Sequence, residues 1–219
     1  MRITLPSGTP AEIARPDGTP SRGLVVVPDI GGLRPLFDDH VARLAEENGW
    51  TVCAFELWPG RDDLPTLADR LNAGGSLDDA RVLGDAVAAA DATGVEPVAI
   101  VGFCMGGMYA LKAAGTGRFA RAVSFYGMGR VPDMWQSPTQ GEPLDALTAP
   151  EACPALLLAG TVDPWVPEDD MAALEAAGVE VVRYAGADHG FAHDASRDTY
   201  RAADAADAWR RAIAHLAAP

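Results

Sequence analysis

Residues 99–111, AIVGFCMGGMYAL, place one cysteine among glycines directly after a run of small and β-branched apolar side chains. The run predicts a buried strand and the residues after Cys104 predict a helix, so the cysteine would lie in a sharp strand-to-helix turn. A nucleophile in such a turn has a strained backbone, and the glycines two residues away on each side, Gly102 and Gly106, leave room for it. The pattern alone fits a buried structural cysteine equally well.

Short apolar runs alternate with longer segments of helical periodicity along the chain. This alternation predicts an α/β fold with a mainly parallel central sheet and helices on both of its faces. Most of the predicted strands are continuous apolar runs, as expected for buried parallel strands. The predicted strands are Leu24–Val27, Thr51–Phe55, Val98–Val101, Ala122–Phe125, Ala155–Ala159 and Val179–Tyr184. The predicted helices are Leu36–Asn48, Ser76–Ala92, Met105–Ala114, Glu168–Ala177 and Ser196–Ala217. Arg2–Leu5 and Ala11–Arg15 flank the turn-rich PSGTP and predict an antiparallel hairpin at the sheet edge.

Length and composition indicate a single domain, residues 1–219, since a chain of this size can bury about 70% of the surface that its unfolded form exposes. The formal net charge of −14 would repel phosphate backbones and anionic lipids, which argues against nucleic acid and membrane partners. The opening sequence MRITLPSGTP has no apolar signal-peptide core, and no run is long enough to span a membrane, so we expect a cytoplasmic protein. Three widely spaced cysteines indicate reduced thiols.

Two further residues stand where a nucleophile at Cys104 would need partners. Asp163 follows the strand Ala155–Ala159, and His189 follows the strand Val179–Tyr184. The carboxyl ends of parallel strands form the edge at which open α/β sheets place their sites, so the three side chains should meet there. The chain order of nucleophile, acid and histidine is that of hydrolases with a nucleophile elbow. Asp163 alone could be a turn former and His189 alone a loop residue, but together the three favour a catalytic triad.

The chain resembles the dienelactone hydrolase family of α/β-hydrolases over nearly its whole length. The matching segments are VVVPDIGG (25–32), VCAFELWPG (52–60), GFCMGG (102–107), RAVSFYGMG (121–129), GTVDPWVP (160–167) and GADHGFA (186–192). The resemblance implies an α/β-hydrolase fold and a cysteine hydrolase that acts on lactones or related esters without a metal or organic cofactor. It implies Cys104 as the nucleophile, His189 as the base and Asp163 as the carboxylate that orients the histidine. It also implies that Ile30 and Met105 supply the oxyanion-hole N–H groups.

Two positions depart from the family pattern. Members of the family carry a glutamate ahead of the oxyanion residue that takes the thiol proton as substrate binds, and this chain has the shorter Asp29. They also carry an arginine after the histidine turn that grips a substrate carboxylate, and this chain has His193. The resemblance therefore implies Asp29 as the thiol-activating acid and His193 as a substrate-binding residue. Arg61 and Arg70, in the loop region after ELWPG, could replace the missing cation.

Several other residues have both a functional and a structural interpretation. Trp165 follows the acid residue and Trp58 follows another strand, so each could line a pocket or cover the edge of the core. The spacing of His189 and His193 suggests zinc, but Gly190 argues against the helix that would align both rings, so no metal is expected.

The other two cysteines are expected to have a structural role, and the longest loop could have a functional one. Cys53 and Cys153 lie within or beside apolar strands and are expected to be packing residues. The proline-rich stretch 131–154 is the longest irregular region and could cover a site.

The sequence thus predicts an enzyme that cleaves a small-molecule ester or lactone through a Cys104 acyl-enzyme. Because a thiolate is itself a good leaving group, activated esters such as enol lactones should react better than alkyl esters. A general carboxylesterase or thioesterase remains an alternative, as does a non-catalytic binding protein on the same fold. The chain could be a monomer or a homodimer.

Overall fold

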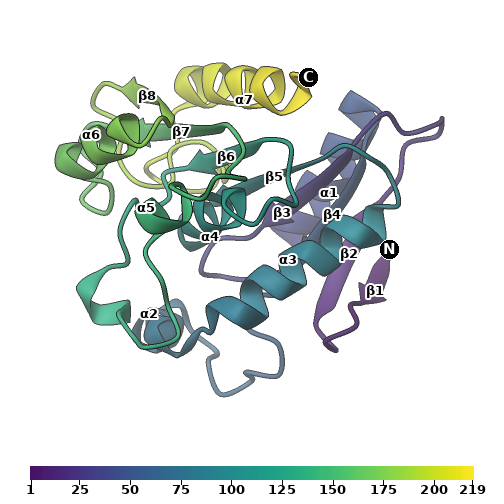
Figure 1. The fold of residues 1–219 in the computed structure, drawn as a ribbon, viewed down its shortest axis with the longest axis horizontal. Helices are drawn as coiled ribbons and strands as arrows, with labels where there is room; N and C mark the ends of the chain where they lie inside the picture. Colours follow the sequence, from purple (N-terminus) through teal and green to yellow (C-terminus); the bar gives the residue numbers. More distant parts are fainter.

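Eight strands form one sheet in the order β1-β2-β4-β3-β5-β6-β7-β8. The computed structural model describes residues 1–219. The strands are β1 (Arg2–Thr4), β2 (Pro10–Ala14), β3 (Gly23–Val27), β4 (Thr51–Phe55), β5 (Val98–Phe103), β6 (Ala122–Phe125), β7 (Ala155–Gly160) and β8 (Glu180–Tyr184). All neighbours from β4 to β8 are parallel, and β1 and β2 form the antiparallel hairpin predicted at one edge. The α/β-hydrolase fold predicted from the sequence is confirmed, with β5 near the middle of the sheet (Figure 1).

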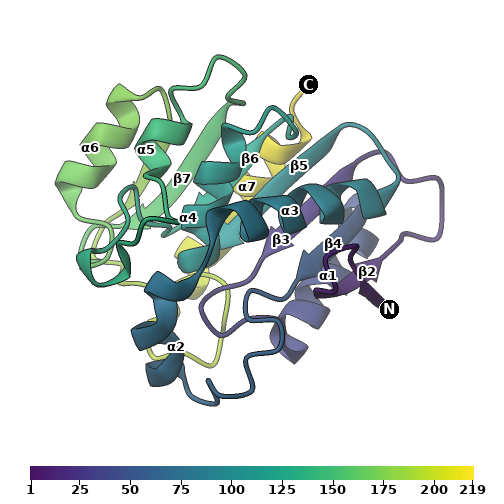
Figure 2. The same ribbon diagram turned by 60° about the horizontal axis from the view of Figure 1, so that its bottom comes forward.

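Helices cover both faces of this sheet. The longer helices are α1 (Pro35–Asn48), α3 (Asp79–Thr93), α4 (Met105–Ala114), α6 (Glu168–Ala176) and α7 (Ala202–Ala217), and the shorter ones are α2 (Leu67–Ala73), α5 (Pro143–Ala146), η1 (Gly74–Ser76) and η2 (Asp133–Trp135). Helices α3 and α4 lie on one face, and α1 and α7 lie on the other (Figure 2). Every residue of the central strands β3, β4, β5, β6 and β7 is therefore buried, which explains their unbroken apolar sequences. No helix combines the length and the apolar character that crossing a membrane would require.

Two predicted helices begin later than expected, and local hydrogen bonds explain both differences. The helix predicted from Ser76 begins at Asp79, because the Asp78 side chain accepts the first free N–H groups and caps it. The helix predicted from Ser196 begins at Ala202. Residues 196–201 form turns instead, and the Asp194 carboxylate accepts both the N–H and the hydroxyl of Ser196 there.

The long stretch 131–154 is partly helical rather than irregular, since it contains η2 and α5. Its Trp135 is buried, donates its indole N–H to the Leu71 carbonyl at 2.8 Å and stacks on Trp165 with ring centres 5.7 Å apart. A Cβ at Gly74 would overlap the Trp135 ring, so this glycine allows the contact. The stretch therefore supports Trp165, which follows Asp163 by two residues.

The close approach of β5, α4 and β3 predicts that Gly106 tolerates no side chain. A Cβ at this position would overlap the carbonyl oxygens of Val27 and Pro28, which are backbone atoms and cannot rotate away. We expect Gly106→Ala to lower the free energy of unfolding by about 2 kcal/mol or more. Gly84→Ala is the matched control, because Gly84 lies inside α3 with open space around it. This control should be unchanged or up to about 1 kcal/mol more stable in urea unfolding, and equal stabilities of the two variants would contradict the packing described.

Candidate active site

Cys104 lies in the strained turn between β5 and α4. Its φ of 55° and ψ of −121° are unusual for a residue with a side chain, and its N–H donates to the Phe125 carbonyl of the adjacent strand at 3.0 Å. A Cβ at Gly102 would overlap the Gly106 carbonyl, so the flanking glycines have the steric function that the sequence predicts. The thiol is only partly buried, and it lies at the N-terminus of α4, whose dipole favours negative charge.

Asp163 and His189 meet at the carboxyl ends of β7 and β8. His189 Nδ1 donates to Asp163 Oδ2 at 2.8 Å, and the side chain of Asp163 is fully buried. The Trp165 N–H donates to the other carboxylate oxygen of Asp163, also at 2.8 Å, which holds the acid in place. His189 Nε2 is buried and has no hydrogen-bond partner, so this nitrogen is available for chemistry.

The pKa of His189 indicates which group its free nitrogen serves. Burial acts to lower this pKa, but Cys104 and, next, Asp163 outweigh burial and raise it to about 10. A histidine with this pKa is an imidazolium at neutral pH, and Cys104 comes first among the groups that raise it. Cys104 thus lies at the same edge of the sheet as the hydrogen-bonded His189–Asp163 pair, each residue after the carboxyl end of its own strand.

The loop after β3 is held by side chains from several elements. The Trp58 indole N–H donates to the Ile30 carbonyl at 2.8 Å, and Arg70 donates to the Gly31 carbonyl. The Glu56 carboxylate accepts the Leu33 N–H at 3.0 Å. The Ile30 N–H itself donates to no protein atom, and the Met105 N–H is the first of α4 and has no acceptor within the helix.

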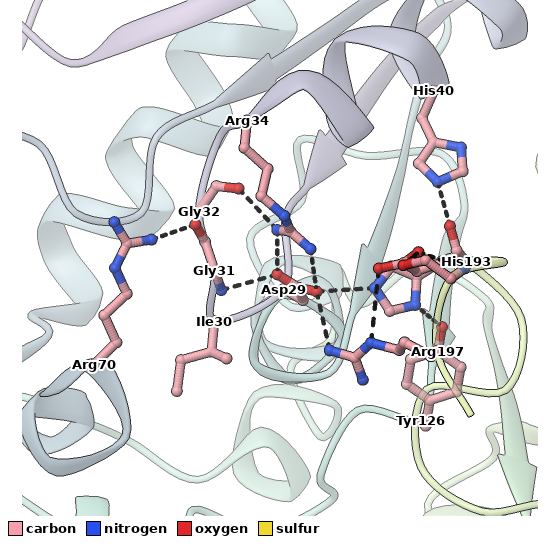
Figure 3. Close-up of polar contacts among 12 residues, drawn as sticks. Asp29, Ile30, Gly31, Gly32, Arg34, His40, Arg70, Tyr126, His193 and Arg197 are labelled. Carbon is pink, nitrogen blue, oxygen red and sulfur yellow. Dashed lines mark hydrogen bonds and ion pairs between the residues drawn. The ribbon is translucent and has the colours of Figure 1, made fainter. Parts of the chain in front are cut away.

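Asp29 does not fit its predicted role as the acid that activates the thiol. Both of its oxygens accept from Arg34, at 2.6 and 2.9 Å, and they also accept from His193 Nε2 and from the Gly31 N–H (Figure 3). Burial acts to raise the pKa of Asp29, but the His193 and Arg34 contacts outweigh it and hold the pKa well below its usual range. A carboxylate in this state is a weak base and has no hydrogen bond to Cys104, so its contacts assign it to the structure of the loop.

His193 is also placed differently from its prediction. Its side chain is 0% exposed, with Nε2 bonded to Asp29 at 2.9 Å and Nδ1 to the Tyr126 hydroxyl. The ring stacks on Phe103 with centres 5.1 Å apart, and burial lowers its pKa, so it is neutral at pH 7. His193 therefore cannot offer a positive charge to a substrate.

The remaining predicted binding residues divide between the site and its surroundings. Trp165 lines an open cavity of about 580 Å³ together with His189, Arg197 and Leu67. Trp58 is buried under the loop that it braces, and Arg61 pairs with the exposed Asp63 outside this cavity. Arg70 is occupied by backbone carbonyls.

Arg197 is a cavity residue that sequence reasoning missed. Its guanidinium makes no hydrogen bond within the protein and its side chain is 30% exposed. It forms two longer ion pairs, with Asp29 Oδ2 at 3.7 Å and with Asp194 Oδ2 at 3.9 Å (Figure 3). The sequence carries no signal for this role, because residue 197 falls inside a predicted helix that in fact begins at Ala202.

Comparisons with known proteins agree with this architecture. The family model "Dienelactone hydrolase family" matches residues 9–218. A Bradyrhizobium protein named "Probable 2-oxo-3-(5-oxofuran-2-ylidene)propanoate lactonase" is 31% identical over 209 residues, which cover 88% of this chain and 82% of that protein. A crystal structure from Klebsiella pneumoniae, described as "Putative Dienelactone Hydrolase", superposes with a TM-score of 0.84 at 30% identity, and the match covers 100% of this chain and 98% of that chain. The chain belongs to the dienelactone hydrolase family and is a hydrolase of carboxylic esters or lactones.

Proposed function

We propose that the chain hydrolyses activated esters, and above all lactones that carry a carboxylate, through a Cys104–His189–Asp163 triad. The observation that carries the proposal is the placement of His189, whose Nδ1 donates to the buried Asp163 at 2.8 Å and whose pKa Cys104 and Asp163 raise to about 10 against the effect of burial. This pKa describes an imidazolium between a thiolate and a carboxylate, the arrangement of a cysteine hydrolase ready to react.

The reaction proceeds in two halves. The Cys104 thiolate attacks the carbonyl carbon, and the negative charge that develops on the carbonyl oxygen is stabilised by the Ile30 and Met105 N–H groups. Collapse of this intermediate expels the ester oxygen, which takes the proton from His189 Nε2 and leaves a thioester on Cys104. Neutral His189 then removes a proton from water, the hydroxide attacks the thioester, and the thiolate leaves. Asp163 keeps the Nδ1 proton in place throughout.

Leaving-group chemistry favours enol lactones. In the first intermediate the thiolate and the ester oxygen compete to leave, and an alkoxide leaves far less readily than a thiolate. An enolate is a better leaving group than an alkoxide, so acylation completes with enol lactones and stalls with ordinary alkyl esters. The name of the Bradyrhizobium relative describes a substrate of this chemistry, an oxofuranylidene lactone with a carboxylate.

Arg197 supports the preference for an anionic substrate. Its guanidinium lies in the cavity that also contains His189, and its two acidic neighbours, Asp29 at 3.7 Å and Asp194 at 3.9 Å, are too far away for hydrogen bonds, so its donors can bind a ligand. A carboxylate fits such a fork with two parallel hydrogen bonds. Arg197 thus has the role that the sequence comparison suggested for position 193.

Thiol labelling tests the identity of the nucleophile. Burial raises the pKa of Cys53 to about 12 and that of Cys153 to about 11, so both remain neutral thiols at pH 8 and should react slowly. We expect iodoacetamide at pH 8 to modify Cys104 first and to abolish esterase activity in proportion, as read by peptide mapping. Cys104→Ser should lose most activity. Equal labelling rates for the three cysteines in the folded protein would contradict the proposal.

Substitution of Arg197 tests the charge of the substrate. Arg197→Gln should raise KM for an anionic enol lactone by about tenfold or more, since charge-assisted hydrogen bonds are lost, and should leave KM for a neutral aryl ester unchanged. Arg210→Gln is the control, because Arg210 is exposed and pairs with Asp207 on α7. If KM for both substrate classes is insensitive to Arg197→Gln, the anionic preference is wrong and a general carboxylesterase or thioesterase is the better description.

A further inference from the structure

A network of hydrogen bonds among three buried side chains, Tyr126, His193 and Asp29, connects three separate parts of the site. The Tyr126 hydroxyl bonds to His193 Nδ1, and His193 Nε2 bonds to Asp29, beside Ile30 (Figure 3). These side chains come from the loops after β6, β8 and β3. None of the three takes part in the reaction steps proposed above, and each is almost completely buried.

Only one assignment of donors and acceptors satisfies this hydrogen-bond network. Asp29 is ionised and can only accept, so His193 carries its proton on Nε2 and donates it to Asp29. Burial keeps His193 neutral, so its Nδ1 is an acceptor, and the Tyr126 hydroxyl must donate to it. Nothing in the network can rotate without leaving a buried polar atom unpaired.

At one end of this network, Asp29 and its neighbours hold the peptide groups on either side of Ile30. One carboxylate oxygen of Asp29 accepts the Gly31 N–H at 2.8 Å, while the Ile30 carbonyl accepts from Trp58. These two bonds hold the Ile30–Gly31 peptide group. The peptide group that carries the free Ile30 N–H is held through its other end, because the Asp29 carbonyl accepts from the Gly32 N–H at 2.9 Å. A shift of Asp29 would therefore move that N–H, and misplacement of a catalytic group by about 1 Å can cost about 10²-fold in rate.

At the other end of the network, Tyr126 packs against His189. The Tyr126 ring meets His189 edge to face with centres 5.2 Å apart, and Tyr126 has the left-handed φ of 41°. His193 is fixed independently, because its backbone carbonyl accepts from His40 Nε2 at 2.8 Å and its ring stacks on Phe103, the residue before Cys104.

We infer that Tyr126 and His193 are positioning residues that hold the Ile30 N–H in the oxyanion hole through Asp29. The inference rests on the function proposed above and adds which residues keep the oxyanion hole in its position relative to Cys104 and His189. Neither residue touches substrate. Their effect is confined to steps in which an oxyanion forms.

Two reactions of Cys104 separate this role from a general structural one. Acylation by p-nitrophenyl acetate adds the thiolate to a carbonyl, forms an oxyanion and expels p-nitrophenolate, so it needs the hole. Alkylation by iodoacetamide forms a C–S bond as iodide leaves, with no oxyanion, and depends on the thiolate and His189 alone. The ratio of the two rate constants therefore reports the oxyanion hole.

Three variants and one control complete the experiment. Tyr126→Phe removes the hydroxyl and keeps the ring against His189. His193→Leu removes both bonds of the ring, and His193→Gln keeps an N–H that can reach Asp29. Tyr184→Phe is the control, since Tyr184 donates to Asp207 at 3.0 Å and also packs on an aromatic ring, that of Phe191.

We expect His193→Leu and Tyr126→Phe to slow acylation by about 10- to 100-fold with alkylation at the parent rate, and His193→Gln to recover much of the loss. Tyr184→Phe should change neither rate. If Tyr126→Phe, which is conservative enough to fold, acylates at the parent rate or slows both reactions equally, the inference is overturned while the proposed function stands. A parent protein in which Cys104 forms no acyl-enzyme would overturn both.

Discussion

The left-handed backbone of Cys104 is the constraint on which the other features of the site depend. A residue with a side chain adopts φ 55° only when its surroundings enforce it, and here the end of β5, the first turn of α4 and the Phe125 carbonyl do so together. The turn is so tight that Gly102 and Gly106 must lack side chains. Because β5 lies near the middle of the sheet, the thiol emerges where loops from both sides can reach it.

Two histidine–aspartate pairs lie on loops at the same edge of the sheet as this turn. Their environments shift the pKa values of the two histidines in opposite directions. In the first pair His189 donates to Asp163 through Nδ1, and Cys104 and Asp163 raise the pKa of His189 to about 10 against its burial. His193 and Asp29 are bonded on every side, and burial keeps His193 neutral. In the function that we propose, the first pair exchanges protons with a substrate, whereas the second holds the loop that carries Ile30.

The sequence predicted the features that depend on local pattern. The central strands were correct to within two residues, since continuous apolar runs such as Ala122–Phe125 leave little freedom in placing them. The meeting of Asp163 and His189 followed from their positions after parallel strands. The direction in which a side chain points depends on packing between distant segments. The burial of His193 against Phe103 and the exposure of Arg197 in a turn therefore have no signature in residue spacing.

The most direct test of this account is the titration of His189 by NMR of the imidazole nitrogens, in the parent and in Cys104→Ala. His189 in the parent should stay protonated through neutral pH and titrate near about 10, as its pKa requires. Removal of the thiolate should lower that pKa markedly, because Cys104 contributes most among the effects that raise it and burial acts in the opposite direction. A His189 that titrates near its usual value of about 6.5 in both proteins would show that the turn does not place a thiolate beside the histidine, and would contradict the account.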